Sequence, residues 1–467
     1  MVDSFRVEKD YLGPVNVPSD AYYGVQTTRA LENFKISGQR AHPLFIRTSA
    51  LVKWAAALGN IKAGTLDRKK GDAICRAAEE VYGGKLLDQF PLDVFQAGAG
   101  TSHNMNVNEV IANRAIELLG GQRGQYSLVH PNDDVNMSQS TNDFIPTVIR
   151  VTTLLLLREL LQELDSLTTS LGELETQHGS VVKPGRTHLM DAAPIRYGQV
   201  FEGWRRTLSK DGERLQKASE MLTELNLGGS AVGTGVNAEP KYVDEALTFL
   251  SSKTGFKFKS PQSFVDVTHS MADMLWAASS LKVLAVDISK ISSDLRLMNS
   301  GPVTGFGEVT LPAVQPGSSI MPGKVNPVIA ECMNMICFRV MGSERAVEEA
   351  AHAGQMELNV MMPLIAYELT FSTEIMKNGM KMLREKLLSG LEIDVAREKH
   401  YLEASSGIAL ALNPYLGFDR TAEIVKEAMK RGVSIRQVIS ERRLMTDKEL
   451  DRVLDPYKIT QRGVVRG

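Results

Sequence analysis

The sequence predicts a mainly α-helical fold with a central bundle of long helices. The run from Gln262 to Ser300 contains neither glycine nor proline, and its apolar residues recur at steps of three and four, which is the spacing of one helix face. A helix of that length would extend on the order of 55 Å. Trp276 and Val283 lie off the main apolar stripe, so more than one face needs a neighbouring helix. No stretch shows the sustained alternation expected of strands.

Three further segments repeat the helical spacing and complete the predicted bundle. Their apolar positions run from Leu154 to Leu171, from Phe201 to Leu225 and from Ile365 to Leu387. The pair Asp211-Gly212 is expected to interrupt the second segment. Pro363 precedes the third segment, where it either begins a helix in its first turn or kinks a longer one.

Glycine and proline punctuation divides the chain into three predicted domains. Residues 1–138 mix short helical patterns with stretches such as GPVNVPSD and are expected to form an N-terminal mixed, mostly helical domain. Residues 139–394 contain the long helical segments and form the predicted central bundle. Residues 395–467 contain short helical patterns separated by LNPYLG and RGVS, which predicts a small C-terminal helical domain.

Composition excludes several classes of protein. Of 467 residues, 43% are hydrophobic and 23% charged, and the formal net charge is −2, so no basic surface is available for nucleic acid or an anionic membrane. The longest aliphatic run, Leu154 to Leu157, is far shorter than the roughly 20 residues of a membrane span, and no secretory signal is recognised. Three cysteines at uneven positions form no disulfide framework. We therefore expect a cytoplasmic protein with reduced cysteines.

Four short segments cluster small hydroxyl and amide side chains, which would be costly to bury without a purpose. They are GAGTSHNMNVNE (98–109), NMSQSTND (136–143), GRTHLMDAAP (185–194) and GSSIMPGKVNP (317–327). Each segment alone is also typical of helix caps and turns. The fourth is not a phosphate loop, because five residues separate its two glycines and Val325 follows Lys324 where that motif needs Ser or Thr.

Other ligand motifs are absent from the sequence. The glycine-rich stretch GGSAVGTG (228–235) follows no predicted strand, so it is interpreted as a flexible or tightly packed connection rather than a dinucleotide site. The eight histidines include no H-E-x-x-H and no close pairing with cysteine, so no metal is predicted. One lysine, one histidine and many neutral donors suit a small dianionic substrate. Such groups stabilise charge developing on a carboxylate while the neighbouring carbon loses a proton, as a β-elimination requires.

These segments resemble a known family. GSSIMPGKVNP closely resembles the signature loop of the aspartase/fumarase superfamily, and the other three segments resemble its remaining active-site regions in the same order. The N-terminal stretch RVEKDYLGPVNVPSDAYYGVQTTRALENFKIS and the C-terminal ALNPYLGFDRTAEI extend the resemblance over essentially the whole chain. The resemblance implies a three-domain subunit that assembles a homotetramer through its central bundle. It further implies active sites built from three subunits and no cofactor.

The resemblance also implies roles for individual residues. Ser318 would be the general base, acting from a mobile loop that closes and supplies donors to its alkoxide. The substrate α-carboxylate would be held by Lys324 and Asn326. The β-carboxylate, whose charge rises in an enediolate-like intermediate, would be held by Thr101, Ser140, Thr141 and Ser319. The leaving group would be surrounded by Asn142, Thr187 and His188, with His188 oriented by Glu331.

Details of the segments favour one reaction within the superfamily. Ala99 and Thr141, together with YYGVQT (22–27) and GQMELNVM (354–361), are more similar to aspartases than to fumarases. This similarity implies a carbon–nitrogen lyase that reversibly converts L-aspartate to fumarate and ammonia. In contrast, HPNDDVN (130–136) resembles the fumarase version, Met362 stands where matching aspartases usually have glutamate, and His103 is unusual beside Thr101.

Three alternatives therefore stay open. A fumarate hydratase acting on L-malate and fumarate and a lyase for a modified aspartate both fit these departures. A catalytically silent structural protein on the same scaffold is disfavoured, because Ser318, Lys324, Asn326 and His188 occur together. His103 itself is interpreted as a polar residue near a helix end.

Overall fold

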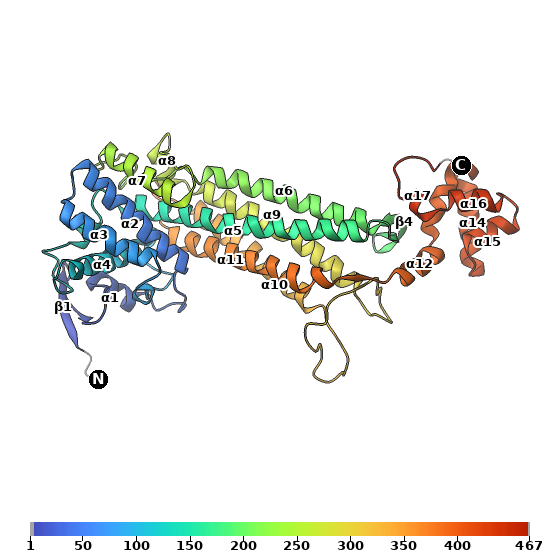
Figure 1. Cartoon of the computed structure of the whole chain (residues 1–467), viewed down its shortest axis with the longest axis horizontal. Coiled ribbons are helices and arrows are strands. Elements are labelled where there is room, and N and C mark those ends of the chain that lie inside the picture. The colour runs from blue at the N-terminus through green and yellow to red at the C-terminus, as the bar shows by residue number, and fades with distance from the viewer. Residues whose placement is uncertain (1–3, 466–467) are drawn as a thin grey trace. The chain divides into compact units, whose positions relative to one another are not determined.

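Helices account for most of the described chain, residues 4–465 of a computed structural model (Figure 1). The long helices are α2 (Pro43–Ala63), α4 (Thr101–Leu118), α5 (Thr141–Gln177), α6 (Tyr197–Met221), α9 (Ala272–Met298), α10 (Val328–His352) and α11 (Met362–Lys386). The shorter helices before α11 are α1 (Val25–Asn33), α3 (Arg68–Tyr82), α7 (Pro240–Thr254) and α8 (Phe264–His269). Those after it are α12 (Val395–Ala404), α13 (Asn413–Leu416), α14 (Phe418–Arg431), α15 (Ile435–Glu441), α16 (Asp447–Val453) and α17 (Pro456–Ile459). The predicted mainly α fold is confirmed.

Two compact units make up the chain. Unit 1 comprises the residues up to Leu161 together with Gly212–Ala285 and Cys337–Lys377. Unit 2 comprises Gln162–Asp211, Val286–Ile336 and the residues from Asn378 onward. The unit boundaries fall inside long helices, whereas the predicted domain limits at 138 and 394 lie just before α5 and α12. The three-domain division stays a prediction.

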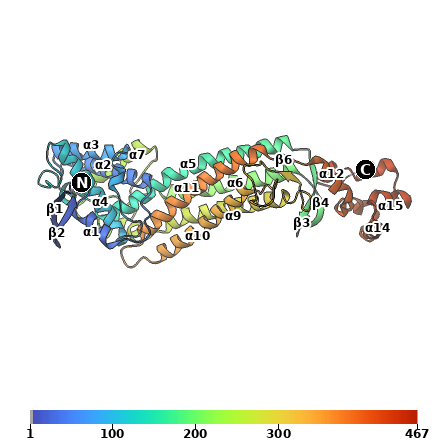
Figure 2. The ribbon, with the colours of Figure 1, turned by 90° about the horizontal axis from the view of Figure 1, so that it is seen from below.

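Helices α5, α6, α9, α10 and α11 run side by side in both views (Figures 1 and 2), and ion pairs join their flanks within each unit. In unit 1, Lys377 of α11 pairs with Glu159 of α5 at 2.8 Å, and Lys282 of α9 pairs with Glu344 of α10 at 2.7 Å. In unit 2, Arg384 of α11 pairs with Glu163 of α5 at 2.7 Å. Because buried leucines line the facing sides of these helices, the charged pairs mark the edges of an apolar core.

Large apolar side chains stay exposed along α9 and α10. In unit 1, Trp276 and Phe338 are 45% and 60% exposed, and in unit 2 Met335 is 63% exposed. The sequence predicted that the helix within Gln262–Ser300 is apolar on more than one face, and α9 confirms this prediction. An exposed apolar stripe of this kind on a globular chain typically marks an interaction surface.

Two expectations for the bundle were wrong. The run Gln262–Ser300 is two helices rather than one, because Ser270 is extended, with φ −92° and ψ 125°, and ends α8 before α9 begins. Helix α6 continues through Asp211-Gly212 without a break. The penalty of about 1 kcal/mol for a glycine inside a helix is outweighed by burial of Leu208 and Leu215 on either side. Pro363 occupies the second position of α11 and so begins that helix, which is one of the two predicted roles.

Three short antiparallel pairs were not predicted from the sequence. They are β1 (Phe5–Asp10) with β2 (Gly13–Pro18), β3 (Val182–Thr187) with β4 (Met190–Arg196), and β5 (Val309–Thr310) with β6 (Glu392–Ile393). In the first pair the polar Arg6 and Glu8 face inward, while Phe5 and Val7 are exposed. This inverted polarity hides the usual signal of alternation with the apolar side chains buried.

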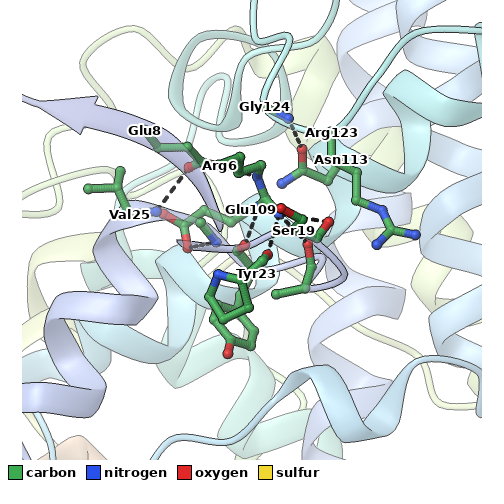
Figure 3. Close-up of polar contacts among 12 residues, drawn as sticks. Arg6, Glu8, Ser19, Tyr23, Val25, Glu109, Asn113, Arg123 and Gly124 are labelled. Carbon is green, nitrogen blue, oxygen red and sulfur yellow. Dashed lines mark hydrogen bonds and ion pairs between the residues drawn. The ribbon is translucent and has the colours of Figure 1, made fainter. Parts of the chain in front are cut away.

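Polar contacts attach this hairpin to the rest of unit 1 (Figure 3). Arg6 Nε donates to Glu8 Oε1 at 2.7 Å, and the backbone N–H of Val25 donates to Glu8 Oε2 at 3.0 Å. Glu109, from α4, accepts the N–H groups of Gly24 and Gln26 at 2.8 Å each. A buried carboxylate from one helix thus caps the N-terminus of another, α1, and satisfies backbone donors that would otherwise have no partner.

None of the described helices combines the length and apolar character needed to cross a lipid bilayer. The three cysteines are unpaired in the described chain, and Cys75 and Cys337 are buried.

His103 lies in the first turn of α4, in agreement with its interpretation as a polar residue near a helix end, but its side chain is in the core of unit 1. It is 3% exposed, and its Nε2 lies 3.0 Å from Ser49 Oγ. Ser49 Oγ also lies 2.9 Å from the carbonyl oxygen of Phe45, so the Ser49 hydroxyl can donate to that carbonyl while it accepts from a protonated Nε2. Burial, with a smaller contribution from Lys53, lowers the pKa of His103 to about 4. The imidazole is therefore neutral in the folded protein at neutral pH.

His103 makes the folded state sensitive to acid. Its folded-state pKa of about 4 lies below the ordinary histidine value near 6.5, so the unfolded chain binds the proton first and stability falls as pH drops from about 6.5 towards 4. We expect His103→Gln to remove on the order of 3 kcal/mol of this pH dependence. Urea unfolding of both proteins at several pH values between about 4.5 and 7.5 checks this. If the difference in free energy of unfolding between the wild type and His103→Gln stayed constant across that pH range, the assignment of the acid sensitivity to His103 would be contradicted.

Gly59 permits close packing of α2 against α7. A Cβ atom at this position would lie 2.6 Å from the carbonyl oxygen of Tyr242, closer than any van der Waals contact. We expect Gly59→Ala to push the two helices apart and lower the free energy of unfolding by about 1–3 kcal/mol. Gly203→Ala is the matched control: a Cβ atom added to this helical glycine would meet nothing within 4 Å, and alanine should stabilise the protein by about 0.5–1 kcal/mol. Equal stability of the two variants would refute the packing argument.

Candidate active site

The first predicted segment forms the N-terminus of α4, in unit 1. Ala99 and Gly100 adopt left-handed conformations, with φ of 61° and 85°, and turn the chain into the helix that begins at Thr101. Thr101 is exposed, and Gln96 Oε1 accepts the N–H of His103, in the first turn, at 2.7 Å. This leaves the N–H groups of Thr101 and Ser102 as the first-turn donors for a carboxylate, which the helix dipole also favours.

The second segment forms the N-terminus of α5, in the same unit. Ser140 Oγ accepts the N–H of Asn142 at 3.2 Å, and Asp143 Oδ1 accepts the N–H of Ser140 at 2.8 Å, which is a reciprocal cap. Asn104, one turn along α4 from Thr101, donates to Thr141 Oγ1 at 3.2 Å. Unit 1 thus brings together the predicted residues Thr101, Ser140, Thr141 and Asn142.

Lys53 lies behind this pair of helix ends and was not predicted as part of the site. Its side chain is fully buried, and Nζ donates to Asn136 Oδ1 and Gln139 Oε1 at 2.9 Å each and lies 3.9 Å from the ring centroid of Phe144. Burial holds the pKa of Lys53 well below its usual range. The sequence signal was a single lysine in the otherwise apolar stretch ALVKWAAAL, because a charge at such a position needs dedicated partners.

The third segment forms the β3–β4 hairpin of unit 2. Thr187 pairs with Met190, so His188 and Leu189 form a two-residue turn with φ of 55° and 62°. Left-handed conformations at both turn residues are typical of a type I′ turn, in which non-glycine residues are strained. Thr187 and His188 are both exposed at the tip.

A buried ion cluster holds this strained hairpin. Glu308, which is fully buried, accepts from Lys183 Nζ at 2.7 Å and from Arg186 Nε and Nη2 at 2.9 and 2.7 Å. The guanidinium of Arg186 also lies over the ring of Phe306, 4.4 Å from its centroid. Two N–H groups of Arg186 converge on one oxygen of this buried carboxylate and Lys183 occupies the other, so the chain just before Thr187 and His188 has little freedom.

The fourth segment is an irregular loop in unit 2. Its two ends are joined by the N–H of Gly317, which donates to the carbonyl of Lys324 at 2.8 Å, and by Asn326 Nδ2, which donates to the carbonyl of Gly317 at 2.6 Å. Ser318 Oγ accepts the N–H groups of Ile320 and Met321 at 3.2 and 3.0 Å. These two donors stabilise negative charge on the Ser318 oxygen.

The remaining predicted residues lie around the same loop. Lys324, Asn326 and Glu331 line one cavity of unit 2, with Glu331 in the first turn of α10. Ser319 is exposed next to Ser318. Among the described residues of unit 2, no hydrogen bond or ion pair joins the hairpin turn to the loop, so the expected contact between Glu331 and His188 stays a prediction.

The predicted site residues therefore form two sets within one chain. Unit 1 carries Thr101, Ser140, Thr141 and Asn142, and unit 2 carries Thr187, His188, Ser318, Ser319, Lys324, Asn326 and Glu331. Over the part of the chain that the structure describes, no three His, Cys, Asp or Glu side chains are grouped so that they could hold a metal ion.

Curated relatives match the chain along nearly its full length. The aspartate ammonia-lyase of Bacillus subtilis is 45% identical over 98% of this chain and 97% of its own. That of Pseudomonas aeruginosa is 45% identical over 97% of both chains, and that of Helicobacter pylori is 41% identical over 97% of both.

Solved structures share the fold. A fumarate lyase:delta crystallin from Brucella melitensis, bound to cobalt, superposes with a TM-score of 0.95 at 43% identity, covering 98% of this chain and 100% of its own. A class II fumarase from Schistosoma mansoni gives a TM-score of 0.94 at 33% identity, covering 98% and 99%. A family model described as lyase matches residues 13–342, and one described as the fumarase C C-terminus matches residues 408–461. With fold, site segments and relatives in agreement, the chain belongs to the lyase family of the aspartase/fumarase superfamily.

Proposed function

We propose that the protein is an aspartate ammonia-lyase, which reversibly eliminates ammonia from L-aspartate to give fumarate. The observation that carries the proposal is the match, at 41–46% identity along the chain, to relatives named for this activity. The geometry of the two residue sets supports the proposal, because it supplies a stabilised serine oxygen, a helix N-terminus at Thr101 suited to a carboxylate, and the hydroxyl groups at the start of α5.

The first chemical step is removal of a proton by Ser318. The base takes the proton from the carbon next to the β-carboxylate, and the electron pair of that C–H bond passes into the carboxylate to give an enediolate-like species. A free serine is a poor base, so the two backbone donors from Ile320 and Met321 to its oxygen are what this step requires.

The helix ends of unit 1 would stabilise the intermediate. Thr101, Ser140 and Thr141, with Ser319 from the loop, are proposed to donate to the β-carboxylate as its charge rises. Because Gln96 satisfies the N–H of His103, the N–H groups of Thr101 and Ser102 are the α4 backbone donors that would serve the added charge.

The amino group then leaves as the electron pair returns. Lys324 and Asn326 are proposed to hold the α-carboxylate, while Asn142, Thr187 and His188 surround the departing nitrogen and Glu331 orients His188. The C–N bond breaks, the C=C bond of fumarate forms, and the proton taken by Ser318 passes to solvent. No step of this scheme requires a cofactor.

Assembly into a homotetramer is part of the proposal. The exposed apolar side chains of α9 and α10, such as Trp276, Phe338 and Met335, support it because four-helix packing between subunits would bury them. We further propose that each active site takes residues from three subunits, so that the two residue sets meet across subunit interfaces. The unpaired cysteines are consistent with the cytoplasm as the place of action.

Fumarate hydratase is the second candidate, favoured by the fumarase-like segment HPNDDVN. In this structure, however, His130 Nδ1 accepts the N–H groups of Asn132 and Asp133 at 3.2 and 3.1 Å and caps a helical turn. The occurrence of His130 in this segment is therefore explained by helix capping, which does not depend on the substrate.

An assay with two substrates tests the proposal. Purified protein is mixed separately with L-aspartate and L-malate, fumarate is followed by ultraviolet absorbance, and ammonia is determined in parallel. We expect equimolar fumarate and ammonia from aspartate and no fumarate from malate, and Ser318→Ala should lower kcat by about 100- to 10,000-fold without changing the circular dichroism spectrum.

Ser389→Ala is the matched control, because Ser389 is an exposed serine whose hydroxyl donates to the carbonyl of Glu385, one helical turn earlier; its activity should equal that of the wild type. Fumarate from malate alone would establish the hydratase instead. Absence of turnover with both substrates would leave a lyase for a modified aspartate or a silent structural protein.

A further inference from the structure

The side-chain amide of Asn142 has a defined orientation. Its Nδ2 donates to the carbonyl oxygen of Ala231 at 2.8 Å, and among the described residues nothing donates to its Oδ1. The amide nitrogen must face Ala231, because two oxygens would repel each other at that distance. Oδ1 therefore points away from Ala231 and is free to accept a hydrogen bond.

Ala231 belongs to the glycine-rich loop 228–235, which one carboxylate attaches to α5. Asp143, fully buried, accepts the N–H groups of Gly228 and Ser230 with Oδ2 at 3.0 Å each. Its other oxygen caps Ser140. The loop and the N-terminus of α5 therefore share one charged anchor and move as one piece.

Glycine is required inside this loop for a second attachment. Gly233 has φ 84°, and a Cβ atom there would lie 2.4 Å from the backbone nitrogen of Val265 in α8. The loop is thus pressed against α8 on one side and anchored to α5 on the other. This close fit identifies the stretch as the tightly packed connection allowed by the sequence analysis.

Asn226 adds a third attachment, to the backbone of Asn142 itself. Its Nδ2 donates to the Asn142 carbonyl at 3.0 Å, and its Oδ1 accepts from Thr268 Oγ1 at 3.2 Å. Asn226 and Thr268 are both fully buried, and the Thr268 hydroxyl is shared with the carbonyl of Phe264 at 2.6 Å. The Asn142 carbonyl only accepts, so it keeps the Asn226 Nδ2 on its side, and the shared Thr268 hydroxyl is the donor to the other side of the Asn226 amide.

We propose that loop 228–235, together with Asp143, Asn226 and Thr268, forms a positioning unit that directs the Asn142 amide oxygen at the amino group of the substrate. The inference rests on the proposed function, in which Asn142 lies beside the leaving nitrogen. An ammonium group only donates hydrogen bonds, so it binds an amide oxygen and is repelled by an amide N–H₂ group. The positioning unit therefore governs ammonia binding rather than binding of the dicarboxylate.

The reverse reaction separates the two kinds of binding. Thr268→Val removes one hydroxyl at constant shape and leaves the buried Asn226 Oδ1 without its donor, which loosens the attachment of Asn226 to the Asn142 backbone. With fumarate and ammonia as substrates, we expect KM for ammonia to rise about tenfold, the effect of losing one oriented hydrogen bond, while KM for fumarate changes less than about twofold. Thr268→Ser, which keeps the hydroxyl, should restore both values.

Two controls keep the experiment decisive. Thr254→Val removes the hydroxyl of another buried threonine of unit 1, one that donates to Leu250 within α7, and should leave both KM values unchanged. If Thr268→Val does not fold, Gly233→Ala replaces it. Gly255→Ala is the matched control for Gly233→Ala. Gly255 also has a positive φ, 79°, but a Cβ atom there would meet no atom within 4 Å. Only Gly233→Ala should therefore raise KM for ammonia.

The outcomes distinguish this inference from the proposed function. An active wild type whose Thr268→Val variant shows equal changes in both KM values, or none, would overturn the positioning unit and leave the lyase activity intact. A wild type that forms no fumarate from aspartate would overturn the proposed function and the inference with it.

Discussion

Two buried ionisable side chains hold the N-terminus of α5, and the geometry of the unit 1 residue set depends on them. Lys53 and Asp143 are both inaccessible to solvent, yet they do not pair directly. Each is satisfied by neutral partners, Lys53 by two side-chain oxygens and Asp143 by three backbone N–H groups. Leaving such a charge without partners would cost several kcal/mol. Residues 136–143 and loop 228–235 are therefore confined to one arrangement, which also fixes the hydroxyl and amide groups that we propose to bind the substrate.

The two sets of residues are built on different physical principles. In unit 1 the groups stand at helix ends over a rigid, hydrogen-bonded base, which suits stabilisation of a charge in a fixed place. In unit 2 they stand on a strained turn held by Glu308 and on an exposed loop closed only at its neck by Gly317 and Asn326. An exposed loop can open to admit substrate and close to shield the base from water, which accords with a serine that becomes basic only when its donors are in place.

Sequence reasoning found the parts whose signal is local. Helical spacing located α5, α6 and α11, and the four polar segments contain every predicted residue of the two sets except Glu331. The roles of these residues stay predictions. The predictions of one helix over Gln262–Ser300 and of an interruption of α6 at Asp211-Gly212 were wrong. Both the observed break between α8 and α9 and the continuity of α6 depend on packing rather than on propensity. Lys53 and Asn226 were missed because their partners lie far along the chain: a lysine at position 53 says nothing of Asn136 until the fold brings them together.

The central claim is that one active site needs both residue sets and takes them from different subunits. Complementation tests it most directly. Thr141→Ala and Ser318→Ala chains, each nearly inactive alone, are unfolded, mixed in equal amounts and refolded together. Random assortment leaves both intact residues at about one quarter of the sites in a tetramer, so the account predicts about a quarter of wild-type activity. A mixture no more active than the mean of the two parent variants would contradict the account.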